Sequence, residues 1–246
     1  MSEAFFRFYA ELNDFLPPHR RMVAFGRQFL VSGSVKDMIE SLGVPHTEVD
    51  LILANGVSVD FNYQVQHQDR ISVYPVFEAL DITPLLRVRS RPLREIRFVV
   101  DVHLGRLAAY LRMLGFDTAY CNNIVDEEVA RISVEESRVL LTRDIGLLKR
   151  SVITHGYYVR ETIPRKQLRE VVERFDLSRQ VNPFSRCLEC NSPLETAGKE
   201  QVQDIVPSSV AYRHQDFARC PSCRRVFWKG SHFHRMKAIL ESIGIP

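Results

Sequence analysis

The chain has 246 residues, of which 45% are hydrophobic and 26% are charged. These proportions are typical of a globular protein, and they exclude a disordered or collagen-like chain. No apolar run approaches the roughly 18 residues that are needed to cross a bilayer. Residues 1–17 carry acids and have no basic region ahead of an apolar stretch. We therefore predict no signal peptide, no membrane association and a cytoplasmic location.

Charge is distributed unevenly along the chain. Residues 1–82 hold 6 basic and 11 acidic side chains, residues 83–186 hold 19 and 13, and residues 187–246 hold 8 and 6. An acidic N-terminal third followed by a basic remainder indicates separate modules, and a basic module can bind a polyanion such as RNA. The same excess also fits ordinary surface variation, so charge alone does not decide between the two interpretations.

Residues 1–80 have the pattern of a small β-rich domain with one helix. The apolar residues of 35–42 follow helical spacing, and Ser34 is a suitable N-cap for that helix. Asn55 and Gly56 form a strong hairpin signal between two strands. The predicted strands span residues 5–9, 27–31, 49–54, 57–61 and 69–74.

This order of elements, carried by Ser34 to Pro75, resembles the β-grasp, ubiquitin-like fold of the small sulfur-carrier proteins of thiamin and molybdopterin synthesis. Sulfur carriers end in a free Gly-Gly that is activated as a thiocarboxylate. Here Tyr74 to Phe77 continues into further chain without a Gly-Gly. We therefore expect this domain to bind a protein partner or to act as a scaffold, and not to carry sulfur.

Residues 81–95 are predicted to be a basic linker between two domains. They contain Pro84 and Pro92 and most of the arginines that lie between residues 87 and 97. The segment suits a solvated connector, which is the interpretation we favour, or a strap that contacts phosphates.

Residues 96–180 alternate strands and helices, which predicts an α/β domain with a parallel sheet covered on both faces. The first strand is almost entirely apolar, as buried parallel strands are. Cys121 falls on an apolar strand and is expected to be a buried core thiol. The predicted strands span residues 96–100, 118–121, 139–142 and 157–159, and the predicted helices span 104–114, 126–137, 145–154 and 165–175.

Three aspartates of this domain lie close behind predicted strands. Asp101 and Asp144 follow strand ends, and Asp126 begins the helix after the second strand and its loop. Ligands of parallel α/β sheets bind at the carboxyl ends of the strands. Hydrolysis of a phosphodiester with Mg²⁺ or Mn²⁺ needs several converging carboxylates. Taken singly, Asp126 suits a helix N-cap and Asp144 a turn, but their common position favours a shared site.

Residues 181–246 contain two Cys-x-x-Cys pairs, Cys187 with Cys190 and Cys220 with Cys223. Each pair can direct two thiolates at one ion, and two pairs complete a tetrahedral Zn²⁺ site with no open position for substrate. Disulfides conflict with a cytoplasmic location, and a redox Cys-x-x-Cys is expected to open a helix beside a βαβ unit. We therefore predict a structural zinc ribbon, in which a hairpin can fill the 29 residues between the pairs.

The segment that follows, residues 224–235, interleaves basic and aromatic side chains. This composition suits phosphate contacts combined with base stacking. We favour contact with RNA for Arg224, Arg225 and Lys229. Trp228 suits base stacking and packing of the ribbon equally well.

The combined motifs of residues 98–117, 126–128 and 138–144 are similar to the PIN-like nuclease domain of the mut-seven C-terminal (Mut7-C) ribonuclease family. In that family a four-cysteine zinc ribbon follows the nuclease core, and its closing motif matches residues 227–232. A ubiquitin-like domain precedes the core in many members, so the resemblance covers nearly the whole chain. The resemblance implies metal-dependent ribonuclease activity, with PIN-type carboxylates at Asp101, Asp126 and Asp144. The candidates for a fourth acid, usual in PIN nucleases, are Asp117, Glu127 and Glu128.

The main hypothesis is a ribonuclease that depends on Mg²⁺ or Mn²⁺ and hydrolyses RNA without a covalent intermediate. Arg106 suits a phosphate contact and a helix-surface charge equally well. A second hypothesis is an RNA-binding protein with the PIN fold and little or no catalysis, and a third is an adaptor that acts through the ubiquitin-like domain. The basic residues nearest in sequence to the acids, any of which can hold phosphate, are Arg112, Arg143, Lys149 and Arg150.

Overall fold

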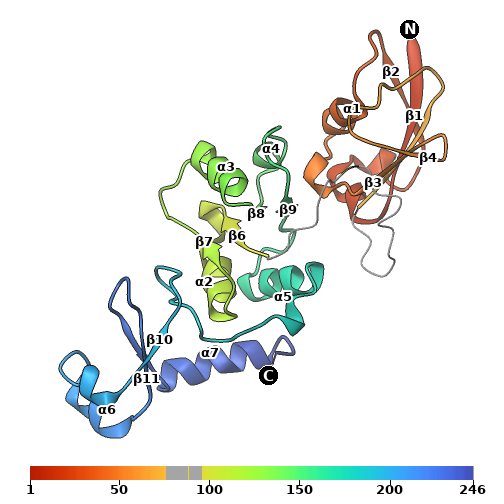
Figure 1. Ribbon diagram of the computed structural model, residues 1–246. Coiled ribbons are helices and arrows are strands. Elements are labelled where there is room, and N and C mark those ends of the chain that lie inside the picture. Colours follow the sequence, from red (N-terminus) through yellow and green to blue (C-terminus); the bar gives the residue numbers. More distant parts are fainter. Residues whose placement is uncertain (76–87, 89–95, 246) are drawn as a thin grey trace. The chain divides into compact units, whose positions relative to one another are not determined.

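The computed structural model describes residues 1–75, 88 and 96–245 (Figure 1). The chain divides into two compact units, Met1–Glu95 with Ala130–Tyr158 and Ile96–Val129 with Val159–Pro246. The prolines and arginines of the predicted linker at 81–95 lie outside the described residues. In the described part of the chain, no helix is long and apolar enough to cross a membrane.

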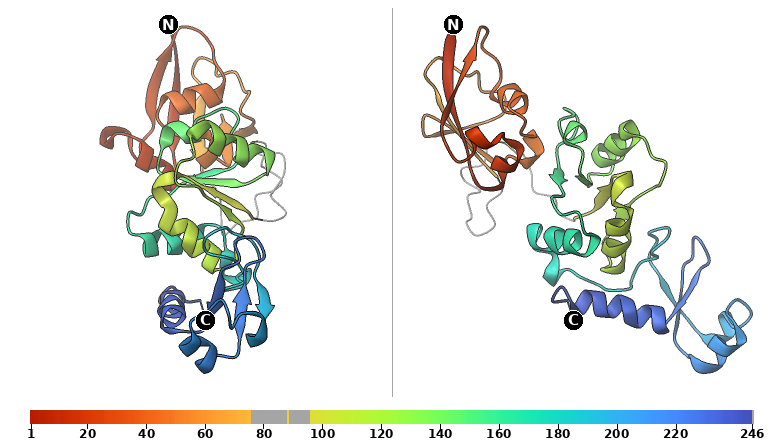
Figure 2. Two further views of the ribbon diagram at one scale, coloured as in Figure 1. Left: turned by 90° about the vertical axis from the view of Figure 1, so that its left-hand side faces the viewer. Right: turned by 180° about the vertical axis from the view of Figure 1, so that it is seen from behind.

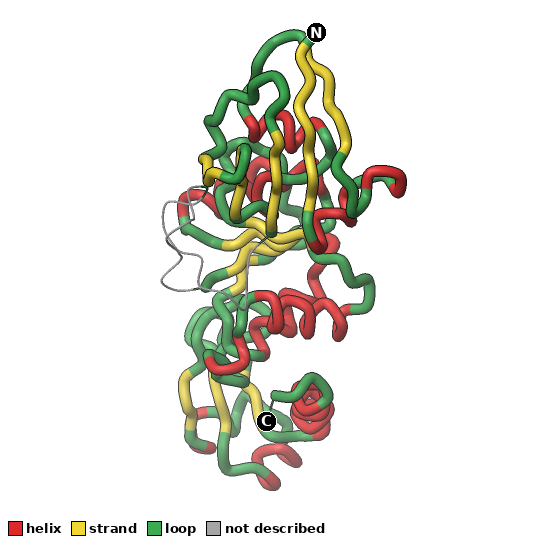
Figure 3. The backbone as a smooth tube through the Cα atoms, turned by 90° about the vertical axis from the view of Figure 1, so that its right-hand side faces the viewer, coloured by secondary structure: helices red, strands yellow, loops and turns green. Residues whose placement is uncertain are grey.

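The first unit begins with a five-stranded mixed sheet in the order β2-β1-β5-β3-β4. Strands β1 and β5 are parallel, and the other neighbours are antiparallel. Helix α1 packs on one face of this sheet (Figure 3), and its apolar side chains join those of the strands in one core. The elements are β1 (Ser2–Phe8), β2 (Phe25–Phe29), α1 (Val35–Ser41), β3 (Leu51–Ala54), β4 (Val57–Val59) and β5 (Arg70–Tyr74), with 3-10 turns η1 (Ala10–Phe15), η2 (Pro18–Arg20) and η3 (His46–Glu48).

Local signals in the sequence account for this sheet. Ser34 caps α1, because its Oγ accepts a hydrogen bond of 3.1 Å from the backbone N–H of Asp37. Asn55 and Gly56 adopt φ angles of 51° and 84°, as a two-residue hairpin turn between β3 and β4 requires. The predicted β-grasp arrangement of a mixed sheet and one helix is confirmed.

The α/β part of the chain contributes a parallel pair of strands to each unit. In the first unit β8 (Val139–Thr142) pairs with β9 (Gly156–Tyr158), and in the second β6 (Phe98–Val100) pairs with β7 (Thr118–Ala119). Every residue of β6 and β8 is buried, as in parallel sheets that are covered on both faces. The α/β fold class is therefore confirmed.

The helices of this part are short. In the second unit α2 and α5 pack against each other, and they lie side by side in Figures 1 and 2. The helices are α2 (Gly105–Met113), α3 (Asp126–Glu135), α4 (Ile145–Leu148) and α5 (Pro164–Arg174), with 3-10 turns η5 (Val102–Leu104) and η6 (Leu177–Arg179).

Two predictions for this part are wrong. The helix expected over 145–154 ends at Leu148, and beyond it the chain turns, with Ile153 completely buried and Val152 55% exposed. Cys121 is exposed, because β7 ends at Ala119 and the chain leaves the core before reaching the thiol.

The C-terminal part of the second unit is a ribbon of three antiparallel strands in the order β10-β11-β12. Its small core gathers Ala197, Val202, Val206, Ala211 and Phe217. The connection between the cysteine pairs is more than the expected hairpin, because it also holds a 3-10 turn and a helix. The elements are β10 (Glu195–Ala197), η7 (Lys199–Gln201), α6 (Ser208–Arg213), β11 (Phe217–Arg219), β12 (Val226–Trp228) and α7 (Ser231–Glu241).

Candidate metal centre and nuclease site

The structure brings the four predicted zinc ligands together. The sulfur atoms of Cys187, Cys190, Cys220 and Cys223 all lie within 4.8 Å of one another. The Sγ atoms of Cys187 and Cys223 are 3.6 Å apart, and those of Cys190 and Cys220 are 3.3 Å apart. A Zn–S bond of about 2.3 Å places tetrahedral thiolates about 3.8 Å apart. The donor set and its spacing therefore fit a four-coordinate zinc ion.

Cys187, Cys190 and Cys220 differ in acidity because their surroundings differ. Burial raises the pKa of Cys187 to about 12, and burial also raises the pKa of Cys220. A hydrogen bond with the Ser192 side chain lowers the pKa of Cys190 to about 6. Metal ligation requires thiolates, so binding an ion must displace protons from the buried members of the cluster.

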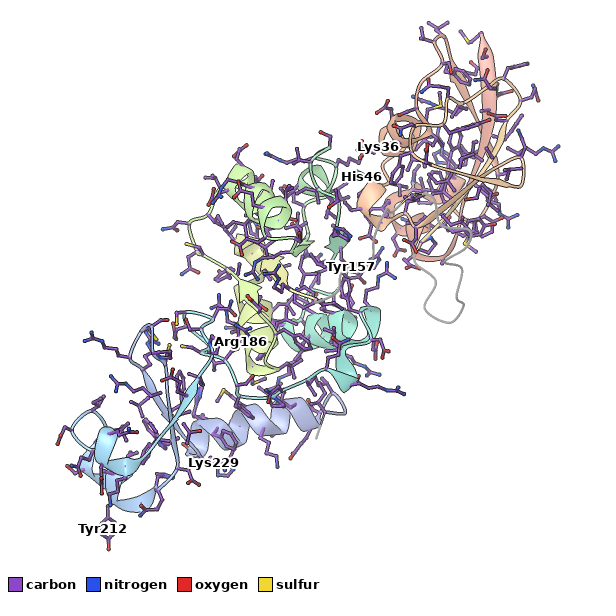
Figure 4. All side chains as sticks on the ribbon, in the orientation of Figure 1. Lys36, His46, Tyr157, Arg186, Tyr212 and Lys229 are labelled. Carbon is purple, nitrogen blue, oxygen red and sulfur yellow. The ribbon has the colours of Figure 1, made fainter. Side chains whose placement is uncertain are left out.

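The first cysteine pair is anchored to the α/β core by the residues around it. Asn191 accepts a hydrogen bond of 2.9 Å from the backbone N–H of Thr118 and donates one of 2.7 Å to Asp117 Oδ1. The Nε of Arg186, labelled in Figure 4, donates to the carbonyl of Gly115 at 3.0 Å. The turn between α2 and β7 and the cysteine loop, residues 187–190 with their neighbours, are therefore joined through side chains.

Arg112 is buried at this junction, with 5% of its surface exposed. Its Nε donates to the carbonyl of Thr118 at 2.9 Å, and one terminal nitrogen donates to the carbonyls of Leu188 and Glu189 at 3.0 and 2.7 Å. Burial lowers the pKa of Arg112, and the nearby cysteines offset only part of this shift. The guanidinium of Arg112 is engaged by these three carbonyls, and its contact with phosphate stays a prediction. It joins α2 to the cysteine loop.

Asp117, one of the candidates for the fourth acid, lies at the same junction. Its Oδ1 accepts from Asn191, and its Oδ2 lies 3.9 Å from a guanidinium nitrogen of Arg186. These contacts give the carboxylate a role in holding the ribbon. Glu127 and Glu128, the other two candidates, lie in the first turn of α3.

Asp101 lies directly after β6, at the carboxyl end of the strand, and is 4% exposed. The Nδ1 of His103 is 3.3 Å from Asp101 Oδ1 and 3.4 Å from Oδ2. The side chain of His103 is 79% exposed, whereas that of Asp101 is only 6% exposed. Asp101 is therefore a carboxylate at the edge of the sheet, with one face screened by an accessible imidazole.

Asp144 and Asp126 are both exposed and both begin helices. Asp144 Oδ1 accepts hydrogen bonds from the N–H groups of Gly146 and Leu147, at 2.7 and 3.3 Å. The sequence suggested a turn position for Asp144, and the structure makes it the N-cap of α4, which fixes the orientation of the carboxylate without excluding a ligand. Asp126 is the first residue of α3. The convergence of the three aspartates stays a prediction.

Three predicted phosphate contacts belong to the first unit. Lys149 is half-buried and its Nζ donates to the carbonyl of Glu40, in the ubiquitin-like domain, at 2.7 Å. The guanidinium of Arg143 lies over the ring of Tyr158, 5.8 Å from its centroid. Arg150 is half-buried. Contact with phosphate stays a prediction for all three residues. The hydrogen bond to Glu40 occupies one of the donors of the Lys149 ammonium group.

The predicted contacts on the ribbon lie mostly at the surface. Arg224 and Lys229 are exposed, and Arg225 forms an ion pair of 2.7 Å with Glu189 in which both side chains are 57% exposed. Trp228 is half-buried and packs on the ribbon core. Tyr212 projects from α6 with 84% of its surface exposed (Figure 4).

Sequence reasoning missed His103, Asn191 and Arg186. His103 lies two residues after Asp101 in the sequence, and that proximity was a usable signal. The partners of Asn191 and Arg186 are separated from them by 71 to 74 residues, so no local pattern could have identified them.

A parallel α/β core with a buried aspartate at a strand end, a four-cysteine ribbon and an N-terminal β-grasp sheet together give the architecture of a PIN-like domain with two accessory domains. The Mut7-C RNAse domain matches residues 96–240, and the Mut7-C ubiquitin domain matches residues 1–81. The chain therefore belongs to the Mut7-C ribonuclease family. Comparison with curated proteins and with solved structures gives no match.

Proposed function

We propose that the protein is a ribonuclease that hydrolyses RNA phosphodiester bonds with Mg²⁺ or Mn²⁺ held by Asp101, Asp126 and Asp144. The observation that carries this proposal is the position of Asp101, a nearly buried carboxylate at the carboxyl end of β6 within the residues that match the ribonuclease domain. Ligands of open α/β sheets bind at this edge.

The chemistry of the donor set fits such an ion. Carboxylate oxygens are the preferred ligands of Mg²⁺ and Mn²⁺. When bound, the ion would neutralise charge on the phosphodiester and increase the acidity of the attacking water. Asp144 keeps one carboxylate oxygen in its helix cap and offers the other. Asp126 presents its carboxylate at an exposed helix start beside two further acids.

The ribbon is proposed to bind structural zinc and to contact RNA. The four thiolates leave no open coordination position, so zinc has no direct part in hydrolysis. Arg224, Arg225 and Lys229 present cations at the surface close to Trp228 in sequence, and cations beside an aromatic ring suit phosphate and base contacts. The ion pair with Glu189 is exposed, so Arg225 can exchange this partner for a phosphate at little free-energy cost.

The test is an Asp101→Asn variant assayed with Mn²⁺ on labelled single-stranded RNA. The substitution keeps the shape of the side chain and removes one charged ligand, so cleavage should fall at least a hundredfold while RNA affinity persists or increases. Asp204→Asn, an exposed aspartate in the ribbon, is the matched control and should retain full activity. Cleavage by Asp101→Asn at the parental rate would assign the activity to another site. RNA binding by the parent without any cleavage would favour an RNA-binding protein.

A further inference from the structure

A cavity of about 530 Å³ opens in the second unit between the beginnings of α2 and α5. Small-molecule pockets enclose roughly 300–1,000 Å³, so the cavity has room for a ligand of nucleotide size. The polar side chains that line it come from η5, α2, the loop after β7, the loop before α5 and the first turn of α5. They are His103, Arg106, Tyr120, Asn122, Thr162 and Gln167.

One glycine allows the wall of this cavity to form. A Cβ on Gly105, the first residue of α2, would lie 2.3 Å from the hydroxyl oxygen of Tyr120 and 2.6 Å from its Cζ. The absence of a side chain lets the Tyr120 ring lie against the helix, where its hydroxyl donates to the carbonyl of Val102 at 3.1 Å. The aromatic ring is thereby held in a fixed position at the cavity.

The lining of the cavity suits an anion that carries hydrogen-bonding edges. None of the residues that line it, all in the described part of the chain, is acidic. Arg106 is exposed at the cavity, and the N-terminus of α5, which opens onto the same space, favours negative charge. Gln167 is only 4% exposed. Its Nε2 donates to the carbonyl of Glu161 at 2.9 Å, which leaves its side-chain oxygen as an acceptor.

His103 connects this cavity to the proposed catalytic edge. Its imidazole lines the cavity, and its Nδ1 lies 3.3 Å from Asp101 Oδ1. An RNA strand whose scissile phosphate lies at Asp101 therefore has a neighbouring nucleotide within reach of the cavity. Base pairing would keep that nucleotide in a helix, so only an unpaired nucleotide can enter.

We propose that this cavity binds an unpaired ribonucleotide next to the scissile bond, with Arg106 pairing with its phosphate and Asn122 and Gln167 contacting the edge of its base. The inference rests on the proposed function, and it adds a nucleotide-binding cavity beside the scissile bond and the residues that hold the nucleotide there. Arg106 then has a binding role and is more than a charge on the helix surface.

The test measures binding of 5′-AMP and 5′-UMP to the full-length zinc-loaded protein by NMR titration, with no Mg²⁺ or Mn²⁺ present. Arg106→Ala removes a charged hydrogen bond and should weaken binding about tenfold. Ala109→Leu adds bulk inside the cavity, because Ala109 lines it, and should abolish binding. Arg169 lies on α5 in an exposed ion pair with Glu173. Its replacement by Ala is the control, and this variant should bind the nucleotides like the parent. If Ala109→Leu does not fold, the comparison of Arg106→Ala with Arg169→Ala still tests the proposal.

Cleavage assays separate this inference from the proposed function. With single-stranded RNA and Mn²⁺, Arg106→Ala should raise KM about tenfold with kcat nearly unchanged. Nucleotide binding by the parent without RNA cleavage would overturn the proposed function and leave the pocket standing. Equal nucleotide binding by the parent, Arg106→Ala and Ala109→Leu, or equal cleavage of single-stranded and duplex RNA, would overturn the pocket.

Discussion

Replacement of Arg112 by Met tests whether the cysteine loop and the α/β core are one cooperative structure. The side chain is 5% exposed and donates three hydrogen bonds, to the carbonyls of Thr118, Leu188 and Glu189. Methionine fills much of the same volume but donates nothing, so three carbonyl groups lose their partner.

The magnitude follows from these contacts. A hydrogen bond from a charged donor contributes about 1.5–3 kcal/mol, and losses within one network are not additive. We therefore expect Arg112→Met to reduce the free energy of unfolding by about 3–5 kcal/mol, the range seen when one partner of a buried charged contact is removed. Two of the three carbonyls lie between Cys187 and Cys190, so zinc affinity should fall about 10–100-fold, as for other residues that orient metal ligands.

Urea unfolding and zinc competition with a chromogenic chelator measure the two effects. Arg225→Met is the matched control, because its ion pair with Glu189 touches the same loop but is 57% exposed on both sides. Exposed pairs contribute about 0–1 kcal/mol, so this variant should behave like the parent. An Arg112→Met protein with parental stability and zinc affinity, or equal losses in both variants, would refute the coupling.

Three further predictions concern other parts of the chain. Zinc affinity should fall as pH falls, and it should fall more steeply below the Cys190 pKa of about 6, where a further thiolate takes up a proton. Competition titrations that show no pH dependence of zinc affinity between about pH 5 and 8 would contradict this. His46→Ala should reduce the free energy of unfolding by about 1–3 kcal/mol, because its Nε2 bonds the carbonyl of Ile153 at 2.7 Å; the exposed His19→Ala is its control in urea unfolding. Asp144→Asn should keep the thermal midpoint of the parent but lose cleavage, since Asn caps helices as well as Asp does. Asp144→Ala should lower the thermal midpoint and also lose cleavage.

Some features of this protein follow from its sequence alone. The spacing of the cysteine pairs predicted the metal centre, because a Cys-x-x-Cys turn determines the direction of both sulfur atoms locally. Ser34 and the Asn55-Gly56 pair predicted a helix start and a hairpin for the same reason. The alternation of strands and helices predicted the α/β core, since periodicity reports which face of an element is buried.

Other features were decided by the tertiary structure. Arg112 and Asp117 have the composition of a phosphate contact and a metal ligand, yet both hold the cysteine loop to the core through partners 74 to 77 residues away. Cys121 is exposed because its strand is shorter than its apolar pattern suggested. The cavity beside Asp101 arises only where α2 and α5 meet. Local patterns carry no information about such partners, because long-range neighbours are determined by how the packed elements come together.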